Sequence, residues 1–199
     1  WCHRGDSQAK GYHRGAGLTT PGAQVEIQAA DGAALPNGHI GEICIRSPGV
    51  MMKYWGLPEA TAQALRDGWM HTGDMGYRDD QGILYIVDRL KDMIISGGEN
   101  VYSAEVEDAI LSMPTVAQCA VIAVPDQKWG ERVHAVVVPA AGASLTEQEI
   151  FDHCRQRIAG FKCPRSVECR DALPVSGAGK ILKFKLREPH WSRQSANVS

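Results

Sequence analysis

The sequence lacks any apolar run approaching the roughly 18–20 residues that a membrane-spanning helix needs. It has no apolar segment of signal-peptide type near its start, which reads Trp1-Cys2-His3-Arg4 without a Met. An excess of one charge is also absent, because 21 Lys and Arg oppose 23 Asp and Glu. A chain with this balance is not expected to bind nucleic acid as a general polyanion. We therefore expect a cytoplasmic protein without a transmembrane segment.

Cysteine pairs with metal-site spacing are missing as well. The six cysteines form no CxxC pair, and no histidine set has zinc-site spacing: Cys2, Cys44, Cys119, Cys154, Cys163 and Cys169. This predicts free thiols in a reducing compartment and no metal centre. Aromatic residues make up only 7% and there are 10 prolines, while 44% of residues are hydrophobic. That composition fits a globular core rather than a disordered or collagen-like chain.

The first half of the chain has the pattern of short antiparallel strands. Alternation of apolar and polar residues over Val25–Ile27 and Gly41–Arg46 predicts two of them, and Ile83–Val87 predicts another after a turn. A short helix is expected to start at Pro58, since proline suits the first helical position. Residues 1–90 are too short and strand-rich for a complete α/β domain. We interpret them as the β-rich end of a larger domain whose beginning lies outside the sequence.

The pattern changes after Asp88. A strand over Met93–Ile95, a helix over Ser103–Met113 and two β-branched strands at Val116–Val124 and Val133–Val138 are predicted. These segments begin a compact α+β unit that we place at residues 91–188.

The rest of this unit follows from helix signals. Thr146-Glu-Gln-Glu149 has the form of a capping box, which predicts a helix from about Glu147 to Ile158. A strand near Ser166–Cys169 and a short basic helix from Lys183 to about Arg187 follow. From Pro189 onward, residues 189–199 are expected to form a frayed, flexible tail.

Four clusters carry residues with chemical potential. In His71-Thr-Gly-Asp74 a carboxylate follows Thr-Gly in an expected loop, where it can accept the two hydroxyls of a ribose; an Asx turn is the structural alternative. Asp88-Arg-Leu-Lys-Asp92 places Arg89 between two strands, where it can reach a ribose or phosphate, or form a surface salt bridge.

The other two clusters are glycine-rich. Ser96-Gly-Gly-Glu-Asn100 lets the backbone approach a ligand closely, although it matches no phosphate-loop motif. Lys180 ends the loop Ser176-Gly-Ala-Gly, which can carry its ammonium group into a site. The spacing of the glycines and the Ile181 that follows exclude a P-loop.

Taken together and in order, these clusters resemble the C-terminal third of the adenylate-forming enzymes, a superfamily of acyl- and aryl-CoA synthetases, nonribosomal adenylation domains and firefly-type luciferases. The resemblance covers nearly the whole chain. The segments that carry it are Gly41-Glu-Ile, Tyr54-Trp-Gly, Pro58-Glu-Ala-Thr61, Gly68-Trp69, His71-Thr-Gly-Asp74, Asp88-Arg-Leu-Lys-Asp92, Ser96-Gly-Gly-Glu-Asn100, Glu105-Val-Glu107, Pro125-Asp126, Gly130-Glu131 and Gly179-Lys-Ile181.

The resemblance implies a function. Such enzymes activate a carboxylate with Mg-ATP to an acyl-adenylate and then transfer the acyl group to a thiol. Asp74 and Arg89 match the residues that hold the ribose hydroxyls of ATP or AMP. Lys180 matches the mobile lysine that meets the carboxylate and the α-phosphate, and is the expected catalytic residue.

The same resemblance implies a moving C-terminal domain. Lys91 matches the hinge about which that small domain turns between the adenylating and the thioester-forming pose. Gly97 and Gly98 are expected beside the thiol tunnel, and Trp129 and Phe161 match aromatic residues that stack on the CoA adenine. Lys162 can add charge toward the CoA phosphates, but Cys163 stands where related ligases carry Arg.

We therefore expect the C-terminal part of an acyl-CoA synthetase of fatty-acid or aryl-acid type, using ATP, Mg²⁺ and CoA. The Mg²⁺ ligands, the phosphate loop and the acid pocket are expected upstream, so these 199 residues alone are expected to be inactive. A nonribosomal adenylation domain is the alternative within the superfamily, although its hinge is normally Asp. A binding module without catalysis is the alternative outside it.

Overall fold

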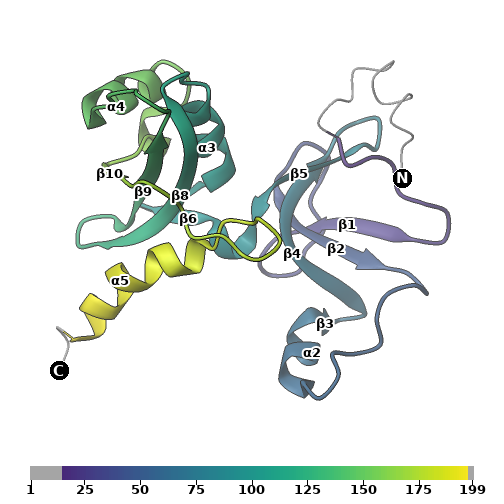
Figure 1. Ribbon diagram of the computed structural model, residues 1–199. Coiled ribbons are helices and arrows are strands. Elements are labelled where there is room, and N and C mark those ends of the chain that lie inside the picture. The colour runs from purple at the N-terminus through teal and green to yellow at the C-terminus, as the bar shows by residue number, and fades with distance from the viewer. Residues whose placement is uncertain (1–14, 197–199) are drawn as a thin grey trace. The chain divides into compact units, whose positions relative to one another are not determined.

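A computed structural model describes residues 15–196 of the chain, which divides into two compact units (Figure 1). The N-terminal unit comprises Trp1–Lys91 and the C-terminal unit Asp92–Ser199. The sequence-based boundary at 90/91 differs from this division by one residue. Within residues 15–196, none of the helices has the length and apolar character to cross a membrane.

Within residues 15–91, the N-terminal unit consists of an antiparallel sheet and a short helix. Its elements are β1 (Gln24–Gln28), β2 (Gly41–Arg46), α2 (Pro58–Ala64), β3 (Leu65–Arg66), β4 (Trp69–Arg78) and β5 (Leu84–Arg89), followed by the 3-10 turn η1 (Leu90–Asp92). The long strand β4 is the centre of the sheet, because β2, β3 and β5 all pair with it. Ile27, Ile43 and Met75 fill the buried side.

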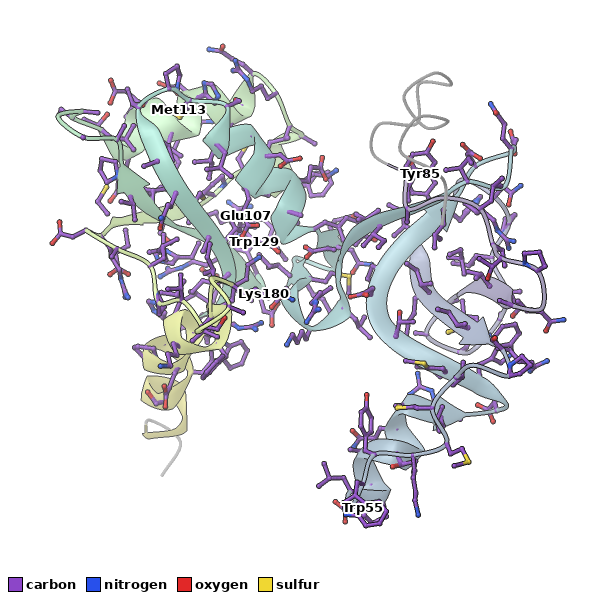
Figure 2. All side chains as sticks on the ribbon, turned by 45° about the vertical axis from the view of Figure 1, so that its right-hand side comes forward. Trp55, Tyr85, Glu107, Met113, Trp129 and Lys180 are labelled. Carbon is purple, nitrogen blue, oxygen red and sulfur yellow. The ribbon has the colours of Figure 1, made fainter. Side chains whose placement is uncertain are left out.

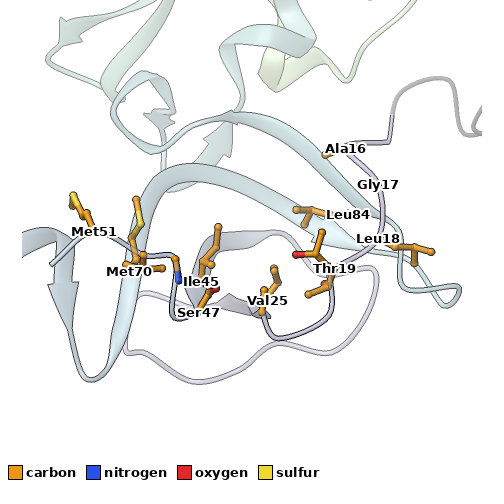
Figure 3. Close-up of a pocket in the computed structure, with 14 residues that line it drawn as sticks. Ala16, Gly17, Leu18, Thr19, Val25, Ile45, Ser47, Met51, Met70 and Leu84 are labelled. Carbon is orange, nitrogen blue, oxygen red and sulfur yellow. Dashed lines mark hydrogen bonds between the residues drawn. The ribbon is translucent and has the colours of Figure 1, made fainter. Parts of the chain in front are cut away.

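The expected strands and the proline-initiated helix of this unit are confirmed. Strand β4 differs from expectation: residues 71–74, expected in a loop, lie inside it. An open apolar pocket of about 720 Å³ lies against this sheet, with Val25, Ile45, Met70 and Leu84 in its lining (Figure 3). None of the predicted site residues lines that pocket.

The C-terminal unit packs helices on both faces of a mixed sheet. Its elements are β6 (Ile94–Ser96), β7 (Glu99–Val101), α3 (Ser103–Leu111), β8 (Val116–Asp126), β9 (Gly130–Pro139), α4 (Glu147–Arg155), the 3-10 turn η2 (Gly160–Lys162), β10 (Ser166–Cys169) and α5 (Lys183–Ala196). The strand order is β10-β9-β6-β7, with β8 also paired to β9. Only the β10–β9 pair is parallel among the described strands.

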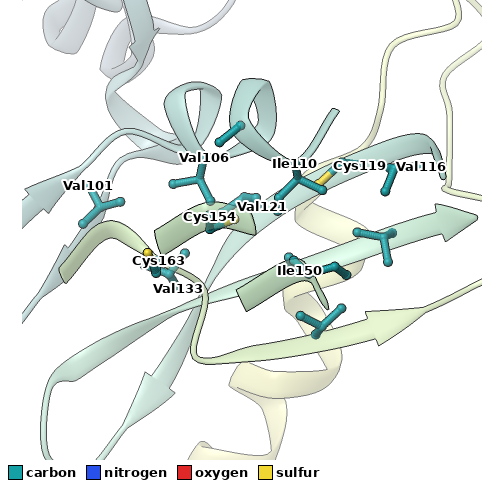
Figure 4. Close-up of a cluster of buried hydrophobic side chains, with 14 of the residues drawn as sticks. Val101, Val106, Ile110, Val116, Cys119, Val121, Val133, Ile150, Cys154 and Cys163 are labelled. Carbon is teal, nitrogen blue, oxygen red and sulfur yellow. The ribbon is translucent and has the colours of Figure 1, made fainter. Parts of the chain in front are cut away.

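Alternation along β8 divides its side chains between two cores. Cys119, Val121 and Ala123 join the core under α3 and α4, which Figure 4 shows. The residues between them point to the opposite face, where Leu186 of α5 and Leu173 complete a smaller core. A strand that is buried on both sides needs apolar residues at nearly every position, which explains the unbroken apolar run.

Helix α4 begins as the sequence predicts. The Thr146 hydroxyl accepts a hydrogen bond from the Glu149 backbone N–H, and the Glu149 carboxylate accepts one from the Thr146 backbone N–H. Both unpaired amides at the helix start are thereby satisfied. The Thr146 hydroxyl also donates a hydrogen bond to the Glu149 carboxylate at 2.7 Å, and this bond, followed by the one from the Thr146 backbone N–H, lowers the pKa of the Glu149 carboxyl. The helix ends at Arg155, a few residues before the predicted Ile158.

Helix α5 corrects the expectation of a short helix and of a frayed tail over residues 189–196, while residues 197–199 of that expected tail lie outside the described residues. It runs on to Ala196 with Pro189 inside it. Tertiary contacts on both sides of the proline explain this. Leu186 is fully buried before it, and after it the Trp191 indole N–H donates a hydrogen bond to the Ala123 carbonyl oxygen at 3.3 Å. Burial of an amphipathic face stabilises a helix more than its intrinsic propensity does.

Candidate functional site

Asp74 lies on a bulge in the central strand of the N-terminal unit. Glu42 pairs with Met75 and Cys44 pairs with His71, so Ile43 alone faces the three residues 72–74. The extra residues leave the regular ladder, and Gly73 adopts a positive φ of 72°. A bulge of this kind turns a side chain away from the sheet, which exposes the Asp74 carboxylate for binding.

Glu42 holds this bulge in place. One of its carboxylate oxygens accepts a hydrogen bond from the Gly73 backbone N–H at 3.1 Å, and the other lies 2.8 Å from Nδ1 of His71. The Arg66 guanidinium is 3.4 Å from the same second oxygen. Thr72 adds two contacts, because its hydroxyl donates to the Ile43 carbonyl and accepts from the Asp74 N–H. The bulge therefore has a fixed shape before any ligand arrives.

Arg89 stands directly opposite Asp74 on the neighbouring strand. The two residues are register partners of β4 and β5, and Arg89 Nε lies 3.5 Å from an Asp74 carboxylate oxygen. Both side chains stay partly exposed, at 56% for Arg89 and 34% for Asp74. Because both side chains keep part of their surface exposed, polar atoms of this pair are accessible to a ligand.

The predicted hinge residue borders the same site. A pocket of about 520 Å³ is lined by Thr72, Gly73, Asp74, Arg89, Leu90 and Lys91. Lys91 lies in the 3-10 turn η1, directly after β5. Three of the predicted site residues, namely Asp74, Arg89 and Lys91, therefore share one pocket of the N-terminal unit.

Lys180 lies at the tip of a tight hairpin in the C-terminal unit, labelled in Figure 2. The Ser176 N–H donates to the Lys180 carbonyl at 2.8 Å, and the Lys180 N–H donates to the Ser176 hydroxyl at 3.2 Å. Gly179 supplies the positive φ of 77° that the turn requires. Leu173 before the hairpin and Ile181 after it pack in the core under α5, so the exposed lysine is carried on an anchored stem.

Glu107 holds the segment that follows the Lys180 hairpin. It was not singled out as a functional residue from the sequence. It accepts a hydrogen bond from the Val121 N–H at 2.7 Å and pairs with the Lys183 ammonium group at 2.7 Å. Helix α3 is thus tied to β8 and to the first residue of α5, just after the hairpin. Its position in the motif Glu105-Val-Glu107 was the available signal.

Gly97 and Gly98 form the turn between β6 and β7, with φ values of 63° and 86°. The Gly97 N–H donates to the Trp129 carbonyl at 2.9 Å, and the indole ring lies against the Gly97 Cα. A Cβ atom at position 97 would lie 2.7 Å from the ring, whereas one at position 98 would meet open space. Two of the predicted CoA residues, Gly97 and Trp129, are therefore in contact.

Positive charge surrounds the Trp129 ring. The Arg165 guanidinium lies 4.3 Å and the Lys128 ammonium 4.7 Å from the ring centroid. Asp126 shapes this loop, because its carboxylate accepts the backbone N–H groups of Lys128 and Trp129. The Lys128 hydrogen bond is the main reason that the pKa of Asp126 lies below its usual value.

Phe161 is 41% exposed in the turn η2. Lys162 beside it does not point freely into solvent, because its ammonium group contacts both carboxylate oxygens of Glu105 at 2.7 Å. The Lys162 charge, which was expected to act toward CoA phosphates, is therefore neutralised by Glu105. The cations around Trp129 were missed by the sequence reasoning, although Arg165 follows Phe161 closely in the chain.

The strand-rich N-terminal unit thus carries the Asp74–Arg89 pair, and the α+β C-terminal unit carries the exposed hairpin with Lys180. Residues 105–180 match the family model of the AMP-binding enzyme C-terminal domain. These residues therefore belong to the C-terminal domain of the AMP-binding enzymes, which are the adenylate-forming superfamily.

Similar proteins agree with this assignment. Over 172 residues the chain is 51% identical to a feruloyl-CoA synthase from Amycolatopsis, covering 86% of this chain and 35% of that protein. It is 47% identical to the long-chain-fatty-acid–CoA ligase FadD13 of Mycobacterium tuberculosis, covering 88% and 34%. The amide bond synthetase McbA from Marinactinospora thermotolerans shares the fold with a TM-score of 0.82 and 41% identity, covering 92% and 38%. The chain spans about a third of the length of the curated relatives it matches.

Proposed function

We propose that this chain is the C-terminal part of an acid–thiol ligase. The reaction consumes ATP, a carboxylic acid and CoA, and yields acyl-CoA, AMP and pyrophosphate through an acyl-adenylate. The observation that carries the proposal is the Asp74–Arg89 pair on a preformed bulge, in a chain whose relatives carry names of such ligases. The alternative of a binding module without catalysis gives no reason for this pair and the exposed Lys180 to occur together.

In this proposal the Asp74 carboxylate accepts hydrogen bonds from the two ribose hydroxyls of ATP or AMP. Its two oxygens suit a vicinal diol, and the bulge presents them at the pocket instead of in the sheet. Arg89 orients the carboxylate from 3.5 Å and donates to the ribose with its remaining N–H groups. Because Glu42 and Thr72 already fix the bulge, binding orders few additional groups.

Lys180 acts in the adenylation step. The carboxylate of the acid must attack the α-phosphate of ATP, and both groups carry negative charge. An ammonium group between them offsets the repulsion and the charge that develops in the transition state. The hairpin that carries Lys180 is anchored at its base and exposed at its tip, which suits a group that enters a site and leaves it.

The thioester step uses the other predicted residues. Lys91 is the hinge, and the Gly97–Gly98 turn borders the passage for the pantetheine thiol, where a side chain would obstruct it. Trp129 and Phe161 offer aromatic faces to the CoA adenine, and stacking of this kind contributes about 1–3 kcal/mol per base. The cations of Lys128 and Arg165 beside Trp129 attract the CoA phosphates.

The proposed substrate class is a fatty acid or an aryl acid, as the names of the relatives suggest. Mg²⁺ accompanies ATP, with its ligands outside these 199 residues, and the cytoplasm is the proposed location. Since the phosphate loop and the acid pocket are also placed outside them, the 199 residues alone are expected to give no ATP–pyrophosphate exchange. ATP–pyrophosphate exchange by the purified chain would contradict the proposal that these parts lie outside it.

A chimera tests the proposal. The chain replaces the matching third of the Amycolatopsis feruloyl-CoA synthase, and two reactions are measured: formation of feruloyl-adenylate and pyrophosphate from ferulate and ATP, and formation of feruloyl-CoA and AMP from supplied feruloyl-adenylate and CoA. Lys180→Ala is expected to slow the first reaction about 10²–10³-fold, the usual effect of removing one preorganised transition-state contact. The second reaction should be unchanged, because the acid is already activated.

Lys185→Ala is the matched control, since it removes an exposed lysine of the same unit from helix α5. It should leave both reactions at the level of the parent chimera. Equal losses of both reactions in Lys180→Ala would overturn the role of Lys180. A correctly folded chimera without either activity would overturn the proposed function.

A further inference from the structure

A second cluster of polar groups lies in the C-terminal unit, on the sheet face that carries the smaller core with Leu186 of α5. His134 belongs to β9, Glu168 to β10 and His190 to α5. Ser166 is the parallel register partner of His134, and Glu168 lies two residues further on the same side of the strand. His190 follows Leu186 by one helical turn, so it faces the same sheet surface.

One nitrogen of this cluster has no protein partner. His134 is only 5% exposed, its Nδ1 lies 2.7 Å from the Ser166 hydroxyl, and its buried Nε2 makes no hydrogen bond within the described residues. Nε2 is 3.7 Å from a Glu168 carboxylate oxygen, which is too long for a hydrogen bond. Buried polar atoms almost always have partners, so this one calls for an explanation.

The distances suit a bound cation better than a hydrogen bond. One ligand atom from each of His134, Glu168 and His190 lies within 4.8 Å of the other two. In a tetrahedral zinc site with bonds of about 2.0–2.2 Å, neighbouring ligand atoms are about 3.4 Å apart. The 3.7 Å between Nε2 and the carboxylate is near that value, and small side-chain movements close the difference.

The surroundings provide the second layer of contacts that metal sites usually have. The Ser166 hydroxyl can accept the Nδ1 proton of His134, which leaves the lone pair of Nε2 directed into the cluster. Arg170 Nε donates to one Glu168 oxygen at 2.7 Å, and this is a different oxygen from the one near His134. Both partners therefore orient a ligand without occupying the atom that would bind the metal.

A second trio of metal-ligating types, formed by Glu42, Cys44 and His71, is a poorer candidate. The Arg66 guanidinium lies 3.0 Å from Nδ1 of His71 and would repel a cation. Burial, the largest cause, raises the pKa of the Cys44 thiol to about 12, so its thiolate form is disfavoured. The two carboxylate oxygens of Glu42 already contact the Gly73 backbone N–H and Nδ1 of His71.

We propose that His134, Glu168 and His190 bind a divalent cation of the zinc type, with water as the fourth ligand. Two imidazoles and one carboxylate are ligands that zinc accepts. The ion would connect β9, β10 and α5, at the end of the smaller core that is remote from Lys183. It would thereby fix the helix that follows the Lys180 hairpin. Sequence spacing did not reveal the site, because its ligands come from three distant segments.

Cobalt substitution tests this proposal on the complete 199-residue chain. The protein is freed of metal with a chelator and titrated with Co²⁺, then with Zn²⁺. We expect the visible absorption bands of four-coordinate Co²⁺, which Zn²⁺ abolishes by displacement, and a rise in melting temperature with Zn²⁺. His190→Gln is expected to remove both effects, and Ser166→Ala to weaken the affinity about 10–100-fold.

His153→Gln is the matched control, because it removes a histidine of the same unit from α4, outside the cluster. It should retain the Co²⁺ spectrum and the affinity. Circular dichroism of His190→Gln checks that the variant is folded, and this partly exposed histidine is preferred to the buried His134 for that reason. The proposal is overturned by unchanged affinity in folded His190→Gln, by absence of Co²⁺ binding, or by a thiolate-to-cobalt absorption band.

Discussion

The turn at Gly97 and Gly98 shows how two neighbouring residues with similar backbone angles have different requirements. Both have positive φ, but a Cβ atom at Gly97 would lie 2.7 Å from the Trp129 ring, and one at Gly98 would lie in open space. Gly98→Ala should therefore lower the free energy of unfolding only through backbone strain, by about 1–2 kcal/mol. Gly97→Ala should lower the free energy of unfolding by about 1–3 kcal/mol more, the typical effect of overpacking. Urea denaturation of the two variants measures the difference.

Gly98→Ala serves as the control for backbone strain in this pair. Equal destabilisation would mean that the Trp129 ring moves aside without a loss of stability, and the contact would then not fix the ring.

The cysteines of the chain should differ sharply in reactivity. Cys44, Cys119, Cys154 and Cys163 are buried, whereas Cys169 is exposed at the end of β10. Burial is the largest cause that raises the pKa of each of the four buried thiols, to about 11 for Cys154. Because the thiolate is the reactive form, iodoacetamide at pH 8 should modify Cys169 first among these five cysteines of the described residues.

Mass spectrometry of peptides checks this order in the native protein and in urea. Native labelling should reach Cys169 at least tenfold faster than the four buried thiols, and denaturation should remove the difference. Fast native labelling of Cys119 or Cys154 would contradict the packing of the core under α3 and α4.

At the level of elements, the start of α4 rests on a reciprocal pair of hydrogen bonds. Thr146→Ala removes the hydroxyl that caps the Glu149 N–H, and loss of such a cap lowers the free energy of unfolding by about 0.5–2 kcal/mol. The Glu149 pKa is lowered in the folded state by bonds from Thr146, so its contribution is present above the unfolded value of about 4.5. That contribution is lost as the pH falls through the lower, folded pKa.

The pH dependence therefore provides a second measurement on the same variant. The stability difference between the parent chain and Thr146→Ala should be largest near pH 7 and should shrink as the pH falls through the lowered, folded pKa of Glu149. Gln148→Ala is a suitable control, because its side chain bonds Asp152 within the helix and takes no part in the cap. If this stability difference stays constant with pH, the Thr146 cap does not depend on the ionisation of Glu149, and the prediction is wrong.

Elements with local signals were predictable from the sequence. The capping box predicted α4, Pro58 predicted the start of α2, and the β-branched runs predicted β8 and β9. Each of these signals acts within a few residues. The chemistry-bearing residues Asp74, Arg89 and Lys180 were recognised through the order of their motifs. Their roles stay a proposal, but the structure brings Asp74 and Arg89 together as register partners.

Features that depend on distant partners were not predictable in this way. The bulge at Asp74 exists because β2 and β4 pair with a shifted register, and Glu42 that holds it is about thirty positions away in the chain. Helix α5 continues through Pro189 because a sheet face binds it on both sides of the proline, an effect that local propensity cannot contain. The cations around Trp129 likewise come from separate segments.

At the scale of the molecule, the chain has separate hydrophobic cores on the two sides of Lys91. Ile27, Ile43 and Met75 belong to the N-terminal unit, and the clusters around α3, α4 and α5 belong to the C-terminal unit. A unit with its own core can fold and move as one body. This is a physical requirement of the proposed reaction cycle, in which the C-terminal unit turns about Lys91 without losing its structure.

A core substitution tests that requirement. Ile110 is a fully buried residue of α3, and Ile110→Ala should lower the stability of the C-terminal unit by about 2–5 kcal/mol. Leu111→Ala removes the neighbouring residue, which is 44% exposed, and should change it by less than about 0.5 kcal/mol. Amide hydrogen exchange resolved by peptide should then show faster exchange in residues 92–196 only. If residues 15–91 lose protection to the same extent, the two units unfold as one cooperative body, and a pivot at Lys91 becomes untenable.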